Sequence, residues 1–128
     1  MFGLSAAVRV YLAKQPADMR KSFDAISALV SGLALEPLSG HLFVFINKRR
    51  DRVKILYWDR DGLAIWAKRL ERGTFRIPDA AADRVEMTTA ELAALLAGID
   101  LDKARRRVRY SRPATPVRNS ENNLPTGA

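Results

Sequence analysis

The sequence predicts an α+β fold: a mostly antiparallel sheet of about five strands (a meander) packed with two helices and followed by a basic, flexible C-terminal tail. Three observations predict this class. Short apolar runs rich in β-branched and aromatic residues alternate with polar turns between residues 41 and 78. Two segments outside that region have apolar residues at helical spacing. The residues after Asp102 include three prolines and few apolar side chains, so we expect residues 1–102 to form one domain and residues 103–128 a disordered tail.

The first strand and the first helix are predicted before residue 40. Residues 8–12 are short, β-branched and alternating, which is typical of a strand. Pro16-Ala17-Asp18 then begins a helix with Asp18 as its N-cap, and this helix should end near Gly32. One apolar stripe follows four helical turns and consists of Met19, Phe23, Ile26, Val30 and Leu33. We expect the stripe to pack on the sheet, and the alternative is a partner-binding face.

Four further strands are predicted between residues 42 and 77. Both faces of residues 42–46 are apolar, so we expect this strand to lie centrally with cover on each side. Two polar turns separate the next strands, and we expect Gly62 and Gly73 to supply a positive φ in them. The last strand of the meander is expected at residues 74–77.

The second helix is predicted after a connector at residues 83–87. Thr88 and Glu91 have the spacing of a capping box, in which a hydroxyl and a carboxylate satisfy free backbone N–H groups at a helix start. Gly98 fits the C-terminal cap of this helix. Its apolar face consists of Leu92, Leu95, Leu96 and Ile99.

Positive charge is concentrated in two places. The chain has 128 residues and a net charge of +8, yet residues 103–128 alone contain seven Lys or Arg and one acid. Within the nearly neutral remainder, residues 48–54 contain five basic groups beside Asp51. A basic loop together with a basic tail favours a nucleic-acid partner over an acidic protein, and the alternative is a solvated surface.

The basic residues form three candidate DNA-binding groups. The first lies at a predicted hairpin tip, where a β-ribbon can enter a DNA groove: Lys48, Arg49, Arg50, Arg52 and Lys54. The second is Arg20 and Lys21, expected in the first turn of a helix, where the macrodipole disfavours cations; pairing of Arg20 with Asp24 is the alternative. The third is Lys68, Arg69 and Arg72. Trp58 and Trp66 could stack on bases, but we expect them to be buried in the sheet.

The sequence does not indicate an enzyme, a metal site or a cofactor. There is no cysteine, and His41 is the single histidine, so thiolate and multi-histidine sites are excluded. Asp59 and Asp61 resemble the start of a calcium loop, but the later ligands are missing. A two-metal nuclease needs several converging carboxylates, and the spacing of the acids does not favour one. We find neither a signal peptide nor an apolar run that could span a membrane, and we expect a cytoplasmic, nucleoid-associated protein.

Several segments in order resemble one family. They are Arg9-Val10-Tyr11-Leu12, Asp18 to Asp24, His41 to Phe45, Lys48 to Lys54, Leu56-Tyr57-Trp58-Asp59 and Lys68 to Phe75. This series is similar to the small accessory protein of insertion-sequence 66 type transposable elements, the TnpB or second open reading frame protein family. The likeness covers about residues 7 to 101. One departure is Ala67, where family members often have an aromatic residue.

The resemblance implies a non-catalytic accessory protein for DNA transposition, encoded beside a larger transposase that holds the catalytic acids. The expected partners are double-stranded DNA at the element ends, the transposase and other accessory proteins. One hypothesis is DNA binding through the basic hairpin. The alternative is a protein–protein bridging factor that assembles the transposase complex with little direct DNA affinity. No catalytic residues come with the resemblance.

Overall fold

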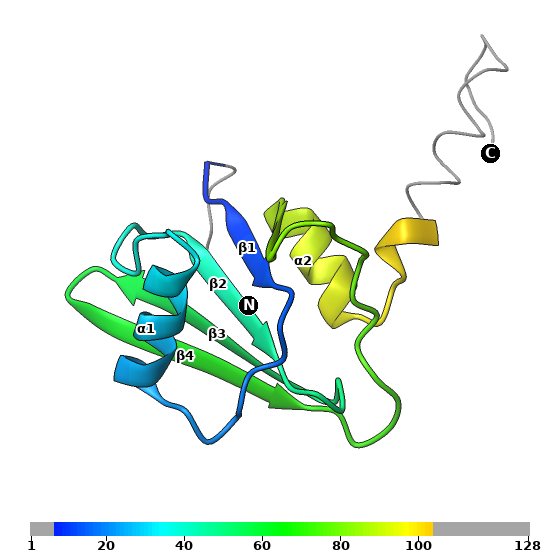
Figure 1. Ribbon diagram of the computed structural model, residues 1–128. Helices are drawn as coiled ribbons and strands as arrows, with labels where there is room; N and C mark the ends of the chain where they lie inside the picture. The colour runs from blue at the N-terminus through cyan, green and yellow to red at the C-terminus, as the bar shows by residue number, and fades with distance from the viewer. Residues whose placement is uncertain (1–6, 104–128) are drawn as a thin grey trace, which may run out of the picture.

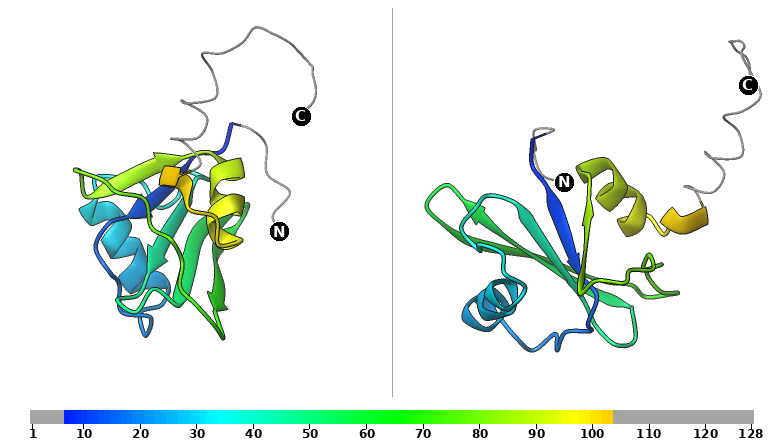
Figure 2. Two further views of the ribbon diagram at one scale, coloured as in Figure 1. Left: turned by 90° about the vertical axis from the view of Figure 1, so that its right-hand side faces the viewer. Right: turned by 45° about the horizontal axis from the view of Figure 1, so that its top comes forward.

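The computed structural model describes residues 7–103, and these form a single five-stranded sheet with one helix on each face (Figures 1 and 2). The elements in chain order are β1 Val10–Ala13, α1 Phe23–Gly32, β2 Leu42–Ile46, β3 Arg52–Asp59, β4 Gly62–Arg69, β5 Arg84–Met87 and α2 Thr89–Leu96. The strand order is β4-β3-β2-β1-β5. Only β1 and β2 pair in parallel, and the other three pairs are antiparallel. The predicted α+β class is therefore confirmed, as is the meander β2-β3-β4. The expected tail lies outside the described residues.

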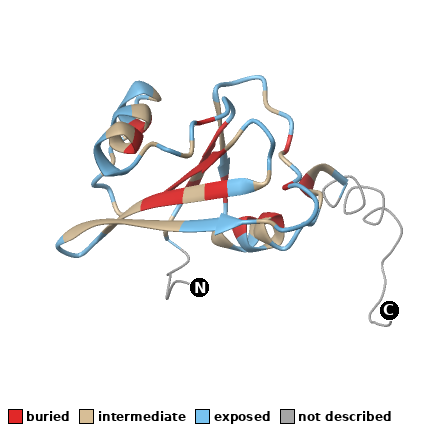
Figure 3. Ribbon diagram, turned by 90° about the horizontal axis from the view of Figure 1, so that it is seen from below, coloured by how far each residue is buried: buried red, intermediate tan, exposed pale blue. Residues whose placement is uncertain are grey.

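The core is divided between the two faces of the sheet. Alternate residues of β2 point to opposite sides, so Val44 packs in the cluster with α2 while Phe43 and Phe45 pack with α1. All five residues of β2 are buried, which confirms its predicted central place with cover on each side (Figure 3). Ile26 and Val30 of the α1 stripe are completely buried, whereas Phe23 is 45% exposed.

Helix α1 begins four residues later than the sequence predicts. Its N-cap is Ser22, not Asp18. The Asp18 carboxylate instead accepts a hydrogen bond from the backbone N–H of Arg20, at 2.9 Å. Such a local bond competes with helix formation, because an Asp side chain can satisfy nearby backbone donors in a turn. Arg20 and Lys21 therefore lie before the helix and not in its first turn.

The predicted strand at residues 74–77 is wrong, and the fifth strand lies at the predicted connector. Strands β4 and β5 are on opposite edges of the sheet. The chain between them must cross the end of the sheet, so it cannot pair along an edge. Strand β5 pairs with β1, with Leu12 opposite Val85. Alternation of Val85 and Met87 with charged neighbours was the available signal for this strand.

The turn and cap predictions have mixed outcomes. Gly73 has the expected positive φ, at 74°. Gly62 does not, and Arg60 takes the left-handed conformation in the β3–β4 turn, with φ 54°. At α2 both bonds of the Thr88–Glu91 capping box are present, and Gly98 follows the helix with φ 87°.

Candidate nucleic-acid interface

The turn between β2 and β3 is held by the side chain of Asn47. Its Oδ1 accepts hydrogen bonds from the backbone N–H groups of Asp51 and Arg52, both at 3.0 Å. Its Nδ2 donates to Oδ1 of Asp51 at 2.7 Å. One amide thus fixes both the backbone and the acidic side chain of the turn, so the basic residues between positions 47 and 52 project from a defined loop.

The segment after β4 supports the same turn from the other side. The backbone N–H of Leu70 donates to the carbonyl of Asp51, and that of Phe75 donates to the carbonyl of Arg50, each at 2.7 Å. Phe75 itself is 1% exposed and packs in the core cluster on the α2 side of the sheet. Residues far apart in sequence therefore hold the turn in place.

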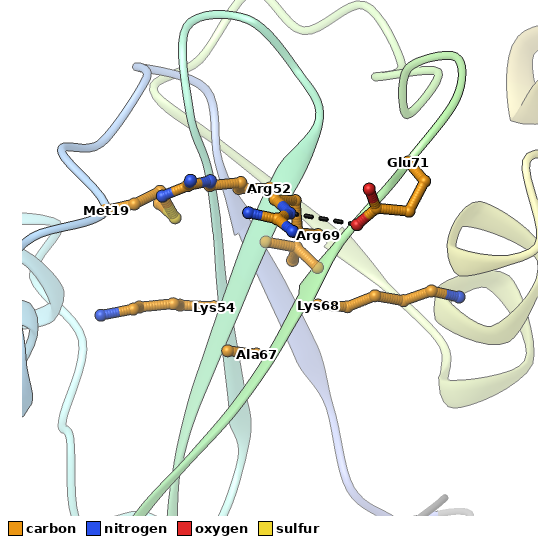
Figure 4. A pocket seen from close by; sticks show the side chains of 8 residues that line it. Met19, Arg52, Lys54, Ala67, Lys68, Arg69 and Glu71 are labelled. Carbon is orange, nitrogen blue, oxygen red and sulfur yellow. Dashed lines mark hydrogen bonds and ion pairs between the residues drawn. The ribbon is translucent and has the colours of Figure 1, made fainter.

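An open, basic hollow lies beside this turn, and we call it the cationic groove. Its larger part has a volume of about 640 Å³ between residues 17–19, the turn at residues 47–52 and residues 69–71. An adjoining part of about 430 Å³ extends along β3 and β4 over Ala67 (Figure 4). Met19 lines both parts. Both hollows are open to solvent, which suits a long ligand better than an enclosed small molecule.

Two arginines face each other across the strands in this groove. Arg52 of β3 is paired in register with Arg69 of β4, so both side chains leave the same face of the sheet. Like charges directly opposite each other in a sheet are destabilising. Arg69 Nε contacts Glu71 Oε2 at 3.1 Å. Within residues 7–103 the Arg52 guanidinium has neither a hydrogen bond nor an ion pair, which leaves a cation available to an external anion.

Lys54 joins the groove to the segment before α1. Its Nζ donates a hydrogen bond to the carbonyl oxygen of Lys21 at 2.6 Å. Figure 4 shows Lys54 and Lys68 pointing to opposite sides of the strands. Lys54 is half-buried, so it has a structural contact in addition to its charge.

Arg20 is committed to a pair within the chain. Its guanidinium donates to both carboxylate oxygens of Asp18, with Nη2 at 2.6 Å from Oδ2. These bonds hold the pKa of the Asp18 carboxyl far below its ordinary range. Arg20 therefore has a local partner, as one alternative from the sequence held. That partner is Asp18, and the expected pairing with Asp24 is absent.

The structure brings part of the predicted set together and separates the rest. The basic residues that line the groove are Lys48, Arg49, Arg52, Lys54, Lys68 and Arg69. Arg50 adopts a left-handed φ of 62° and lines a different hollow with Lys14. Arg72 is exposed beyond β4, and Trp58 and Trp66 are only half-buried. Sequence reasoning missed Asn47, Glu71 and Met19 as groove residues; the Asn at the start of a basic turn was the available signal.

The acid in the turn gives a testable pH effect. The pKa of the Asp51 carboxyl is lowered, chiefly because Asn47 donates to it, with smaller help from Arg49 and Arg52. A pKa that is lower in the folded state stabilises the fold above the unfolded value of about 3.9, and this contribution is lost as the pH falls. We expect Asn47→Ala to raise the pKa of Asp51, followed by NMR titration of its carboxyl carbon. Identical titration in both proteins would contradict this role of Asn47.

Among residues 7–103, no group of three or more His, Asp or Glu could hold a metal ion. In the same part of the chain, no helix has the length and apolar character needed to cross a membrane. Fold and site together define a small single-sheet α+β protein with an open cationic groove at one end of the sheet.

The chain belongs to the IS66 Orf2-like family. The model of this family, described as "IS66 Orf2 like protein", matches residues 8–106. The family associates the chain with IS66-type transposition systems, as an accessory protein. Two similar proteins come from Sinorhizobium fredii (strain NBRC 101917 / NGR234). "Uncharacterized protein y4jC" is 37% identical over 84% of this chain and 92% of its own length. "Uncharacterized protein y4hO" is 38% identical over 73% of this chain and 82% of its own length. No solved structure matches the chain.

Proposed function

We propose that this chain is a non-catalytic DNA-binding accessory protein of transposition, and that the cationic groove contacts the phosphates of double-stranded DNA. The observation that supports this most strongly is the facing pair Arg52 and Arg69. Two like charges in register cost stability in the free protein. A phosphate between or beside them removes that cost and adds charge-assisted hydrogen bonds, which are about twice as strong as neutral ones.

The shape of the site supports a polymer as ligand. Lys48 and Arg49 are exposed at the tip of the turn, and Arg52 and Arg69 continue the positive charge along the strands. Asn47 fixes the turn before any ligand binds, so little ordering cost falls on the binding step. Four cations along an open surface match successive phosphates of a nucleic-acid backbone.

Acidic residues in the groove moderate its charge and limit the number of free cations. Asp18 is neutralised by Arg20, and Asp51 is held by Asn47. Glu71 remains as the direct partner of Arg69. A phosphate that binds Arg69 must therefore displace Glu71 or share the guanidinium with it, whereas Arg52 can bind a phosphate directly.

The test is equilibrium binding of labelled duplexes by the full chain across a salt series. We expect binding whose logarithm falls linearly with the logarithm of salt concentration, with a slope of about 0.9 for each phosphate neutralised. Preference for an element-end duplex over a scrambled one at moderate salt would make the contact sequence-specific. The absence of duplex binding would contradict the proposal and favour the bridging function, in which the basic residues meet acidic protein surfaces.

Glu71→Gln is expected to strengthen duplex binding. The substitution removes the charge that competes for Arg69 and keeps the size of the side chain. The salt slope should rise by about 0.9, because one more cation contacts phosphate. Glu86→Gln on β5 removes an equal charge from an exposed residue far from the groove and serves as the control. Equal gains from both substitutions would indicate a general charge effect and no special part for Glu71.

A further inference from the structure

The outer edge of β4 has the features of a pairing surface. Strand β4 is the last in the sheet order, and no strand within residues 7–103 pairs with its outer side. Residues 63–67 contain neither a charge nor a proline, although proteins ordinarily protect an exposed edge with such residues. The other edge strand, β5, differs: it has four residues, and Arg84 and Glu86 are two of them. Thus charged residues make up half of β5, whereas the first six residues of β4 carry no charge and its two charged residues lie at its end.

The charges at the two ends of β4 are opposite. Asp59 ends β3, and Arg60 and Asp61 form the turn before β4, so this end carries one net negative charge; Lys68 and Arg69 lie at the other end. Parallel pairing of two β4 strands would bring like charges together at both ends. Antiparallel pairing places the acidic end of one strand against the basic end of the other. Opposite charges on facing strands are stabilising and like charges are destabilising.

We propose that a second copy of this chain pairs with β4 through its own β4, antiparallel about a two-fold axis, with Ile65 opposite Ile65 of the second copy. This register sets Asp61 opposite Arg69, and Leu63 opposite Ala67. A shift by one residue would set Arg60 opposite Arg69, two like charges. The central cross-strand pairs are all apolar, and such pairs each contribute roughly 0.2–1 kcal/mol in antiparallel sheets.

The pairing has a consequence for the cationic groove. Directly opposite residues in an antiparallel pair lie on the same face, so α1 of both copies would cover the same side of a continuous sheet. Both grooves would then open on one face. The two Arg69 positions would lie roughly 27 Å apart along the strands, at about 3.4 Å per residue. The basic turns extend further out, toward the roughly 34 Å of one DNA turn. The dimer itself does not depend on DNA binding and is tested without DNA.

The first test is the mass of the full chain in solution without DNA, across a dilution series. We expect a species of twice the chain mass of 14.3 kDa that dissociates on dilution. Ala64→Glu introduces a charge in the middle of the β4 edge and should yield the single-chain mass. Ala93→Glu, at an exposed position of α2, introduces the same charge elsewhere and should leave the mass unchanged. A wild-type chain that is monomeric throughout the series would overturn the proposal.

The second test reads the register by disulfide cross-linking, because the chain has no cysteine of its own. Ile65→Cys should form a covalent dimer on mild oxidation, since directly opposite residues bring their Cβ atoms to about 4.5–5.5 Å. Ala67→Cys alone should not, because its copy would lie about four residues away along the strands. A mixture of Ala67→Cys with Leu63→Cys should cross-link. Ile65→Cys that reacts no faster than Ala67→Cys would overturn the proposed pairing.

Discussion

Replacing Arg49 and Arg52 together with Ala is expected to weaken duplex binding by at least about a hundredfold, because each charge-assisted hydrogen bond is worth about 1.5–3 kcal/mol. The salt slope should fall by about 1.8, or about 0.9 for each phosphate that the variant no longer neutralises. Both side chains are exposed and both line the cationic groove. Neither substitution removes a hydrogen bond within residues 7–103 that supports the fold. Binding is followed by fluorescence anisotropy with the full chain across a salt series.

A second double substitution controls for net charge. Arg50→Gly with Arg72→Ala also removes two positive charges, but Arg50 lines a different hollow and the exposed Arg72 lines neither part of the groove. Arg50 has φ 62°, a conformation that glycine adopts without steric cost. This variant should fold as well as the wild type and lose much less affinity. Equal losses in the two double variants would mean that net charge alone governs binding.

Phe75→Ala is expected to lower the free energy of unfolding by about 3–5 kcal/mol, the usual cost of emptying a buried phenylalanine site. Phe75 is 1% exposed and packs against the core although it lies outside every strand. Its backbone also donates to the carbonyl of Arg50. The loss should therefore loosen the basic turn as well as the core. Urea unfolding followed by circular dichroism measures the change.

The matched control for this substitution is Phe23→Ala. Phe23 begins α1 and is 45% exposed, so removal of its ring leaves little cavity and should cost less than about 1 kcal/mol. Similar losses at the two positions would contradict the view that Phe75 anchors the segment crossing the end of the sheet.

The sequence predicted correctly those elements that depend on residues close together in the chain. The capping box at Thr88 and the apolar residues of β2 each define an element within a few residues. The parallel pairing of β1 with β2 was not predictable in the same way, because it depends on where the chain returns after α1. The same holds for β5, which needs the edge of β1 to become a strand. The predicted helix start at Asp18 was wrong because the Asp18 carboxylate accepts a hydrogen bond within a turn that precedes the helix.

The candidate site shows the same division between local and long-range information. The run of basic residues in the β2–β3 turn is visible in the sequence, and so is the turn itself. Which side chains share a groove depends on backbone details, since the left-handed φ of Arg50 directs it away from Arg49 and Arg52. The facing of Arg52 and Arg69 depends on the register between β3 and β4. Sequence spacing alone does not give that register, because the β3–β4 turn sets it.

The measurement that tests the central claim most directly is an NMR titration of the isotope-labelled full chain with a short duplex. Backbone amides and the Nε–Hε groups of arginine report where the DNA lies. We predict the largest shifts at the groove residues, with Arg52 and Arg69 among them, and small shifts at α2 and β5. Shifts confined to residues 103–128, or no shifts at all, would contradict DNA binding through the cationic groove.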